Sequence, residues 1–171
     1  MEENLTFVPE APQEGNIAEI EDFLAAHWGS YNIVSKGKLT NASRLPRVVC
    51  RGLDSRIVGL ITYLIDREDR SCEVVTINSE IEGAGIGTKL LKMVESTAKG
   101  DSCRRIWLIT TNDNPEAAAF YVKRGYRLIG VHLDALEKSR ELKPQIPVTG
   151  KHGISLRDEW EFEKIIQPTP G

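Results

Sequence analysis

The chain has 171 residues, of which 27% are charged and 40% hydrophobic, and its net charge is −3. A chain of this length buries roughly 70% of the surface that its unfolded state exposes, so we expect one domain spanning residues 1–171. The mild acidity disfavours nucleic acid as a partner, because nucleic-acid binding normally requires a basic face.

Cysteine usage and apolar runs limit the cellular setting. The three cysteines are widely spaced, odd in number and without a histidine at metal-ligand spacing, so we expect a reducing compartment and no metal. The first 15 residues contain neither the basic region nor the apolar region that a targeting leader has. No segment of the chain approaches the ~18 apolar residues that a membrane span needs. We therefore expect a cytoplasmic protein with no membrane partner.

The first half of the chain predicts a helix followed by antiparallel strands. Residues 16–28 repeat apolar side chains with the period of a helix, and residues 29–46 are expected to form a loop with a short helix. Three β-rich runs follow at residues 47–52, 56–66 and 71–78, joined by short polar turns. This pattern is typical of an antiparallel meander, and the nearly continuous apolar second run predicts a central strand.

The next elements form a βαβ unit. After three glycines, apolar residues keep helical spacing over residues 86–98, and Gly100 is expected to end that helix. The run RRIWLITT, residues 104–111, predicts a buried strand parallel to the run 71–78. A short helix should then start after Asn114, an N-cap residue followed by proline, and end before Gly125.

The end of the chain predicts a strand at residues 126–133, a helix at 134–142 and a last strand at 158–166. In the last strand, aromatic residues alternate with glutamates, which predicts an edge strand with a wet acidic face that could pair across a homodimer. Together the elements favour an α/β (α+β mixed) fold, a three-layer α/β/α sandwich around a mixed, mostly antiparallel sheet.

The stretch EGAGIG places Gly83, Gly85 and Gly87 between a strand and a helix. Such a turn leaves backbone N–H groups free to hold an anion, usually phosphate, although the glycines could also serve only a tight turn. A Walker loop is disfavoured because Lys89 follows Thr88 in the wrong order. The dinucleotide fingerprint is also missed, because the glycines alternate strictly and no acidic residue follows at the required distance.

A second motif lies one helix and one strand later, where Asn114, Ala117, Phe120-Tyr121 and Gly125-Tyr126 stand at fixed spacing. With EGAGIG before it, the chain resembles the GNAT superfamily of acetyl-CoA-dependent N-acetyltransferases. The resemblance covers residues 5–133, taken as the core. Residues 134–167, a helix, a loop and a strand, look like the tail of an uncharacterised bacterial subfamily.

The resemblance implies acetyl-CoA as cosubstrate and a parallel strand pair that splays to admit the pantetheine arm. It places the thioester at the backbone of Ile77 and the pyrophosphate on the N–H groups from Gly83 to Thr88. Glu82 departs from the usual Gln or Arg of the family, and its carboxylate is expected to be repulsive unless it points to solvent. The cofactor contacts implied are Ile77, Glu82, Gly83, Ala84, Gly85, Ile86, Gly87, Thr88, Asn114 and Tyr121.

Two catalytic roles are predicted. The resemblance implies that Tyr121 protonates the departing sulfur, and an acceptor amine must lose a proton before it attacks. Glu73, which strict strand alternation puts on the same face as Ile77, is the predicted base, with Glu80 as the alternative. His27 and His132 are expected to be structural, and a covalent route through Cys72 or Cys103 is disfavoured because neither has a nearby histidine.

The predicted activity is acetyl transfer to a primary amine by direct attack in a ternary complex. The acceptor is expected to be a small-molecule or peptide amine, with Trp28, Tyr31 and Arg157 as contacts. The alternative is a catalytically silent GNAT-like sensor that binds CoA without turnover. A longer acyl donor also stays open.

Overall fold

The computed structural model describes residues 4–168 and 170. In order along the chain the elements are β1 (Thr6–Glu10), α1 (Ile17–Trp28), β2 (Asn32–Ser35), β3 (Lys38–Asn41), a 3-10 turn (Ala42–Arg44), β4 (Arg47–Arg51), β5 (Ile57–Asp66), β6 (Ser71–Ser79), α2 (Ile86–Gly100), β7 (Arg105–Thr111), α3 (Pro115–Lys123), β8 (Arg127–His132), α4 (Ala135–Leu142), a second 3-10 turn (Lys151–Gly153) and β9 (Glu159–Ile165). None of these helices is long and apolar enough to cross a membrane.

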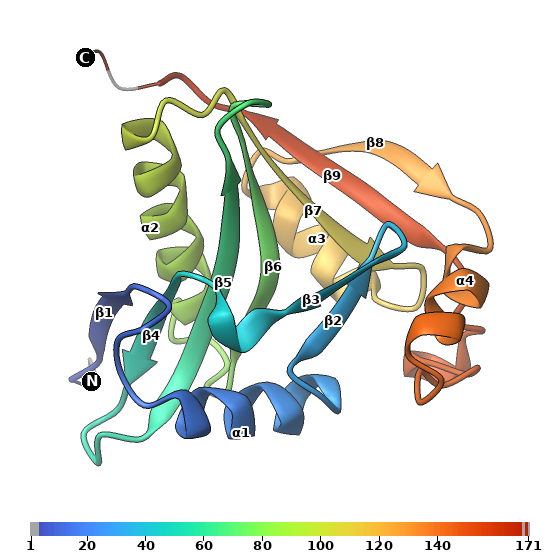
Figure 1. Cartoon of the computed structure of the whole chain (residues 1–171), viewed down its shortest axis with the longest axis horizontal. Helices are drawn as coiled ribbons and strands as arrows, with labels where there is room; N and C mark the ends of the chain where they lie inside the picture. Colours follow the sequence, from blue (N-terminus) through green and yellow to red (C-terminus); the bar gives the residue numbers. More distant parts are fainter. Residues whose placement is uncertain (1–3, 169, 171) are drawn as a thin grey trace.

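The main sheet has seven strands in the order β1-β4-β5-β6-β7-β9-β8 (Figure 1). The meander β4-β5-β6 is antiparallel, and the βαβ unit makes β6 and β7 the parallel pair, as the sequence predicts. The mixed, mostly antiparallel sheet is therefore confirmed.

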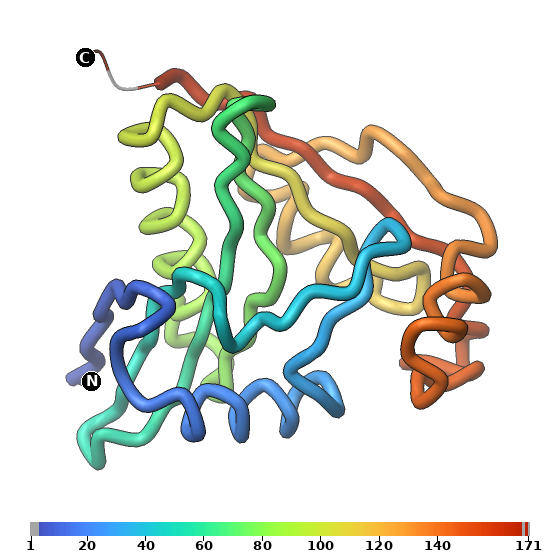
Figure 2. The backbone as a smooth tube through the Cα atoms, in the orientation of Figure 1, coloured from blue at the N-terminus to red at the C-terminus, as the bar shows by residue number. Residues whose placement is uncertain are grey.

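Helices cover both faces of the sheet. The larger apolar cluster joins α2 and α3 to one face, through Leu90, Val94 and Tyr121 among others. A second cluster packs α1 against the opposite face, through Ile20 and Leu24. The hairpin β2-β3 crosses the same face as α1, as the chain trace shows (Figure 2). The three-layer arrangement follows, because each helix buries its apolar stripe against one side of the sheet.

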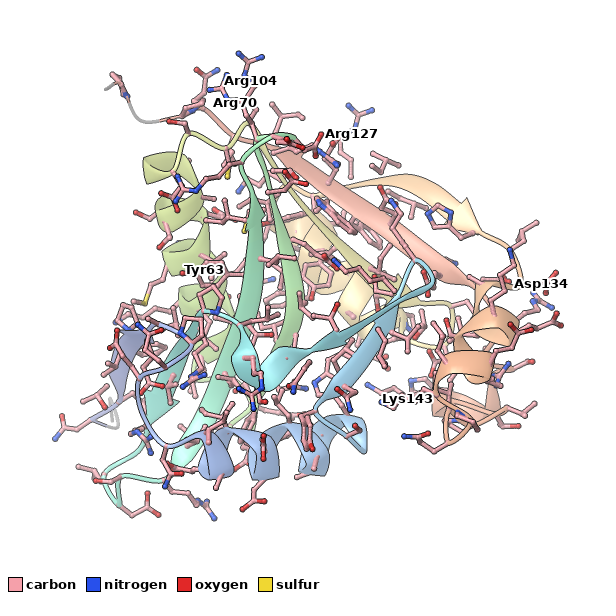
Figure 3. The ribbon with its side chains drawn as sticks, viewed as in Figure 1. Tyr63, Arg70, Arg104, Arg127, Asp134 and Lys143 are labelled. Atoms are coloured by element: carbon pink, nitrogen blue, oxygen red, sulfur yellow. The ribbon has the colours of Figure 1, made fainter. Side chains whose placement is uncertain are left out.

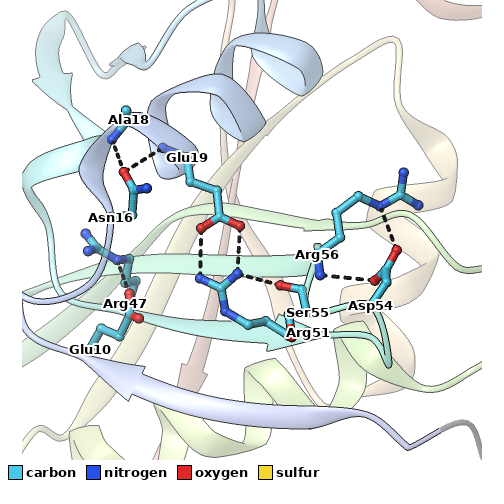
Figure 4. A network of polar contacts seen from close by, with 9 residues as sticks. All are labelled: Glu10, Asn16, Ala18, Glu19, Arg47, Arg51, Asp54, Ser55 and Arg56. Atoms are coloured by element: carbon cyan, nitrogen blue, oxygen red, sulfur yellow. Dashed lines mark hydrogen bonds and ion pairs between the residues drawn. The ribbon is translucent and has the colours of Figure 1, made fainter.

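Polar contacts fix the start of α1 against β4 (Figure 4). The side chain of Asn16 accepts the N–H groups of Ala18 and Glu19, which is the usual N-cap arrangement. Both carboxylate oxygens of Glu19 accept hydrogen bonds from Arg51, at 2.6 and 3.0 Å. The fully buried Arg47 pairs with Glu10 of β1 and donates to the carbonyl of Glu14, just before α1. Together these contacts hold the start of α1 at a fixed place over the sheet.

Three features differ from the sequence predictions. The segment 29–46 contains the hairpin β2-β3 besides the short 3-10 turn, because Lys36 and Gly37 adopt the left-handed conformation that a tight hairpin needs. The strand β1 is not predicted at all, since it is short and pairs only with β4.

The third difference concerns β9, which is not an edge strand. It lies between β7 and β8, and its glutamates are covered, with Glu159 and Glu161 buried and Glu163 half-buried. The alternation of glutamates with aromatic residues indicates that β9 has one polar and one apolar face. It does not show which other parts of the chain cover the polar face. The prediction of a wet acidic face, open to pairing across a dimer, is therefore wrong.

Candidate functional site

The strands β6 and β7 separate midway along their length. They pair in parallel only from Ser71–Arg105 to Val74–Leu108. Beyond this point β6 continues to pair with β5 as far as Ser79, and β7 continues to pair with β9 as far as Thr111. The sheet therefore opens between its two central parallel strands.

A cavity of about 660 Å³ occupies this opening. Ile77 and Asn78 border it from β6, Ile109 from β7, and Asn114 and Tyr121 from the side of α3. On the other side it reaches the end of α1 and the strand β2. The cavity thus connects the two faces of the sheet, so that two substrates could approach each other from opposite sides.

A bulge in β6 decides which way its side chains point. Thr62 pairs with Thr76 but the next residue, Tyr63, pairs with Val74, so Val75 is an extra residue in β6. As a result Ile77 packs in the cluster beneath α2, whereas Val75 packs in the cluster beneath α1. A bulge re-aims the side chains that follow it.

Glu73 is therefore on the opposite face from Ile77. Its pairing partner Leu64 belongs to the cluster beneath α1, whereas Ile61, the partner of Ile77, belongs to the cluster beneath α2. The expectation that Glu73 and Ile77 share a face is wrong, because simple alternation does not foresee the bulge. Glu73 still borders the cavity, and burial raises the pKa of its carboxyl group, an effect that Lys38 and Lys36 partly offset.

The glycine turn begins α2. Gly83 and Gly85 have φ of 73° and 70°, and Gly85 is the N-cap residue without any side-chain cap. Among the described residues, no backbone or side-chain acceptor takes the N–H groups from Gly83 to Thr88. The turn is exposed, as is the side chain of Glu82. Unpaired N–H groups at a helix N-terminus are what an anion requires, so the residues present fit a pyrophosphate.

Arg124 is a residue of this region that sequence reasoning missed. Its Nε and Nη2 donate to the hydroxyl of Thr88 at 2.9 and 2.6 Å, and its guanidinium lies 3.6 Å from the ring centre of Phe120. Gly87 permits this packing, because a Cβ there would lie 3.3 Å from the Phe120 ring. A second hollow of about 420 Å³ follows, where the basic residues Lys92, Lys123, Arg124 and Lys164 outnumber the one acidic residue, Glu95, which pairs with Lys164. The positive charge of this hollow suits a second phosphate group. Sequence analysis could not find the hollow, because its residues come from three elements that are far apart along the chain.

Tyr121 is buried, although its hydroxyl makes no hydrogen bond to any described residue. It borders the cavity from α3, and burial raises the pKa of its phenol. The phenol therefore keeps its proton at any ordinary pH and can donate it. Asn114 also borders the cavity while its Oδ1 accepts the N–H of Ala117 at 3.1 Å, which leaves its amide group for another contact.

The end of α1 brings together residues that are far apart in sequence. Nε2 of His27 lies 3.3 Å from Oε1 of Glu80, and the indole of Trp28 donates to Asn78 on β6. Trp28 borders the cavity as predicted, as does His27. Tyr31 instead packs in the cluster beneath α1, and Arg157 pairs with Asp134 and Asp158, so neither borders the cavity. The predicted contacts of these two residues are not supported.

The C-terminal segment closes the cavity on its outer side. Nζ of Lys143 donates to the carbonyls of Trp28 and Asn32, at 3.4 and 2.9 Å, which ties the end of α4 to α1 and β2 (Figure 3). Buried Asp113 accepts the hydroxyl of Thr111 and the N–H of Lys151. These contacts place residues 143–147 and Leu156 along the cavity wall.

His132 and the three cysteines lie in surroundings that differ from those of His27. His132 pairs with Glu161 at 3.1 Å, outside the cavity lining. Cys50, Cys72 and Cys103 are buried and unpaired to any sulfur, and burial raises the pKa of each thiol. Since the thiolate is the nucleophile, this environment works against a covalent route. Among the described residues, no three His, Cys, Asp or Glu side chains gather as a metal site requires.

The chain is similar to a known family and to curated proteins over most of its length. The model of the acetyltransferase (GNAT) family matches residues 8–126. The chain is 45% identical over 147 residues to the uncharacterized protein YdhI of Bacillus subtilis, covering 86% of this chain and 91% of that relative.

Solved structures match over nearly the whole chain. An IAA acetyltransferase from Bacillus cereus has a TM-score of 0.70 at 20% identity, covering 95% of this chain and 100% of the other. A GNAT family acetyltransferase from Elizabethkingia anophelis with acetyl-CoA bound has a TM-score of 0.67 at 16% identity, covering 95% and 99%. At such identities the likeness establishes the fold.

Proposed function

The chain belongs to the acetyltransferase (GNAT) family, and we propose that it transfers an acetyl group from acetyl-CoA to a primary amine by direct attack in a ternary complex. The observation that carries the proposal is the cavity that passes through the sheet between β6 and β7, with the unpaired N–H groups of the glycine turn on one side. The family fold and the neighbour with acetyl-CoA bound support the same activity.

Acetyl-CoA supplies the activated acetyl group, and the chain would hold it from the side of α2. The N–H groups of the glycine turn, residues Gly83 to Thr88, would bind the pyrophosphate. Arg124 lies beside Thr88 and would add positive charge there. The backbone of Ile77 would border the thioester, where an N–H group stabilises negative charge that develops on the carbonyl oxygen. Asn114 would contact the pantetheine arm.

Tyr121 would act as the acid. Because its phenol is buried against the cavity and its pKa is raised, it stays protonated and can donate a proton to the departing sulfur. His27 and Glu80, whose Nε2 and Oε1 atoms are in contact, lie at the opposite side of the cavity from Tyr121. They would therefore not replace Tyr121 as the donor to the sulfur.

Glu73 would act as the base, directly or through water. The bulge at Val75 turns Glu73 toward the face of α1 and β2, which is the side left for an acceptor when the cofactor enters from the side of α2. An amine with a pKa near ~10.4 arrives mostly protonated and must lose a proton. The raised pKa of Glu73 makes its carboxylate a stronger base than an exposed one.

Calorimetric titration with acetyl-CoA, followed by thiol release with n-butylamine and other primary amines, tests the proposal. We expect micromolar binding and amine-dependent release of CoA. Glu82→Gln is a matched variant that should bind acetyl-CoA at least as tightly, since an exposed carboxylate beside a pyrophosphate is repulsive. Absence of binding up to millimolar acetyl-CoA would show that the glycine turn does not hold the pyrophosphate. Binding without thiol release from any amine would favour the catalytically silent sensor instead.

A further inference from the structure

Three carboxyl side chains border the cavity, namely Glu73, Asp113 and Glu159. Within residues 4–168 and 170, none of them has a lysine, arginine or histidine nitrogen within 4.0 Å. Glu161, the other buried glutamate of the same sheet, pairs with Lys36 and His132 and does not border the cavity. Among the described residues, the buried carboxylates away from the cavity, Glu95, Asp158 and Glu161, each have a countercharge, whereas those that border it do not.

Glu159 is the most deeply buried of the three, with 2% of its surface exposed. Its Oε2 accepts the backbone N–H of Lys36 at 3.1 Å, and its Oε1 accepts the hydroxyl of Ser139 at 3.5 Å. The hydroxyl of Ser139 also donates to the carbonyl of Ala135 at 3.2 Å, so its contact with Oε1 is the weaker of the two. The ammonium group of Lys36 turns away to Glu161, at 2.9 Å. A buried carboxylate is strongly unfavourable without a positive partner, so a cationic group in the adjoining cavity would stabilise the ionised form of Glu159.

The rest of the cavity wall defines what kind of cation fits. Apolar side chains from five parts of the chain surround the space between β6 and the C-terminal segment: Ile33, Val75, Ile109, Leu136, Ile146 and Leu156. Ser35 borders the same space, and its buried Oγ makes no hydrogen bond of normal geometry among the described residues, although it lies near Glu73 and acts to lower the pKa of that carboxyl group. An ammonium group carries three donors, which can serve a carboxylate and a hydroxyl together. Methylene groups would suit the apolar wall.

We propose that Glu159 binds a second, non-reacting ammonium group of the acceptor, so that the preferred substrates are diamines with a short aliphatic spacer. This inference rests on the proposed acetyl transfer. One amino group loses a proton to Glu73 and attacks the thioester carbonyl; a C–N bond forms, the C–S bond breaks, and the thiol leaves with a proton from Tyr121. The nitrogen then releases its second proton as the amide forms, and that proton restores the phenol of Tyr121. The other amino group stays charged beside Glu159, which determines specificity and takes no part in the chemistry.

The test compares kcat/KM for 1,4-diaminobutane with that for n-butylamine, which has the same chain and no second charge. We expect the diamine to be preferred, and Glu159→Gln to lower its kcat/KM by roughly 10- to 100-fold while n-butylamine changes little, as removal of one charged hydrogen bond predicts. Glu161→Gln is the matched control, on the same strand and face and also in contact with Lys36, and should leave the ratio unchanged.

A purely structural role of Glu159 gives a different result. If Glu159 only held the hairpin tip through Lys36, its replacement would lower both kcat/KM values together and keep their ratio, which would overturn the inference while acetyl transfer stood. If neither amine is acetylated, calorimetry of 1,4-diaminobutane with the CoA-bound protein separates the two proposals. Binding that is lost in Glu159→Gln supports the cation site and removes the proposed activity. Absence of diamine binding overturns the cation site.

Discussion

The guanidinium of Arg124 donates two hydrogen bonds to the hydroxyl of Thr88, linking the end of α3 to the first turn of α2. The same guanidinium stacks on Phe120 and donates to its carbonyl. A fixed positive charge therefore lies next to the N–H groups of the glycine turn. A helix N-terminus and a nearby cation reinforce each other toward a phosphate group.

Replacement of this charge should weaken cofactor binding. We expect Arg124→Gln to raise the Kd for acetyl-CoA by about 10-fold, because a charged hydrogen bond contributes on the order of 1.5 kcal/mol or more. Calorimetry gives the affinity, and the midpoint of thermal unfolding shows whether the variant is folded. Arg127→Gln is the control, since Arg127 is exposed on β8 and away from this region (Figure 3). Equal losses in the two variants would assign the effect to net charge alone.

The conformation of Gly85 predicts a cost for any side chain there. Its φ of 70° lies in the left-handed region, although a Cβ would meet no atom within 4 Å. Gly85→Ala should lower the free energy of unfolding by about 1 kcal/mol, through backbone strain alone. Gly100→Ala, at the end of α2 and also in open space, should be neutral or stabilising, because alanine favours a helix. Urea denaturation measures both, and equal effects would contradict the assigned strain.

Replacement of Tyr121 tests whether its hydroxyl is catalytic or only structural. We expect Tyr121→Phe to lower kcat by ~10-fold or more with little change in the KM for acetyl-CoA, since the ring keeps its packing and only the proton donor is lost. Tyr126→Phe is the matched control, because the hydroxyl of Tyr126 donates to Glu95 at 3.1 Å and does not border the cavity. That variant should lose stability and keep kcat. Unchanged turnover in Tyr121→Phe would remove Tyr121 from the mechanism.

The stability of the protein should depend on pH through Glu159. Burial raises the pKa of its carboxyl group above the usual 4.5, so the folded state binds this proton more tightly than the unfolded state. Its contribution to stability is present below the unfolded pKa and is lost as the pH rises through the folded pKa. The free energy of unfolding of the parent protein, relative to Glu159→Gln, should therefore fall as the pH rises from 4.5 through the raised pKa of the folded state.

Glu161 provides a control of opposite sign for this measurement. Although burial acts to raise its pKa, hydrogen bonds from Lys36 and His132 lower the pKa of Glu161 below 4.5. Its contribution is present above the unfolded pKa and is lost as the pH falls. Relative to Glu161→Gln, the parent protein should therefore lose stability as the pH falls below 4.5 and keep it as the pH rises above that value. Parallel trends for the two variants in urea denaturation would contradict both assignments.

Local signals in the sequence are sufficient for much of this architecture. Asn114 and the proline after it define the start of α3, and the glycines of EGAGIG define the turn into α2, because capping and positive φ depend on one or two residues. The meander and the parallel pair follow from apolar runs and the length of the connections. The family motifs rest on the same short stretches.

Other features depend on which segments meet in the folded chain. The bulge at Val75 turns Glu73 toward the face of α1 and β2, and it results from the pairing of β5 with β6 rather than from the residues of β6 alone. Insertion of β9 between β7 and β8 buries Glu159, although its sequence reads as a half-exposed strand. Arg124 meets Thr88, and His27 meets Glu80, across 36 and 53 residues. The sequence by itself determined most of the elements and the glycine turn, whereas the tertiary structure decided which charges face the cavity, because burial and countercharge depend on neighbours that are remote along the chain.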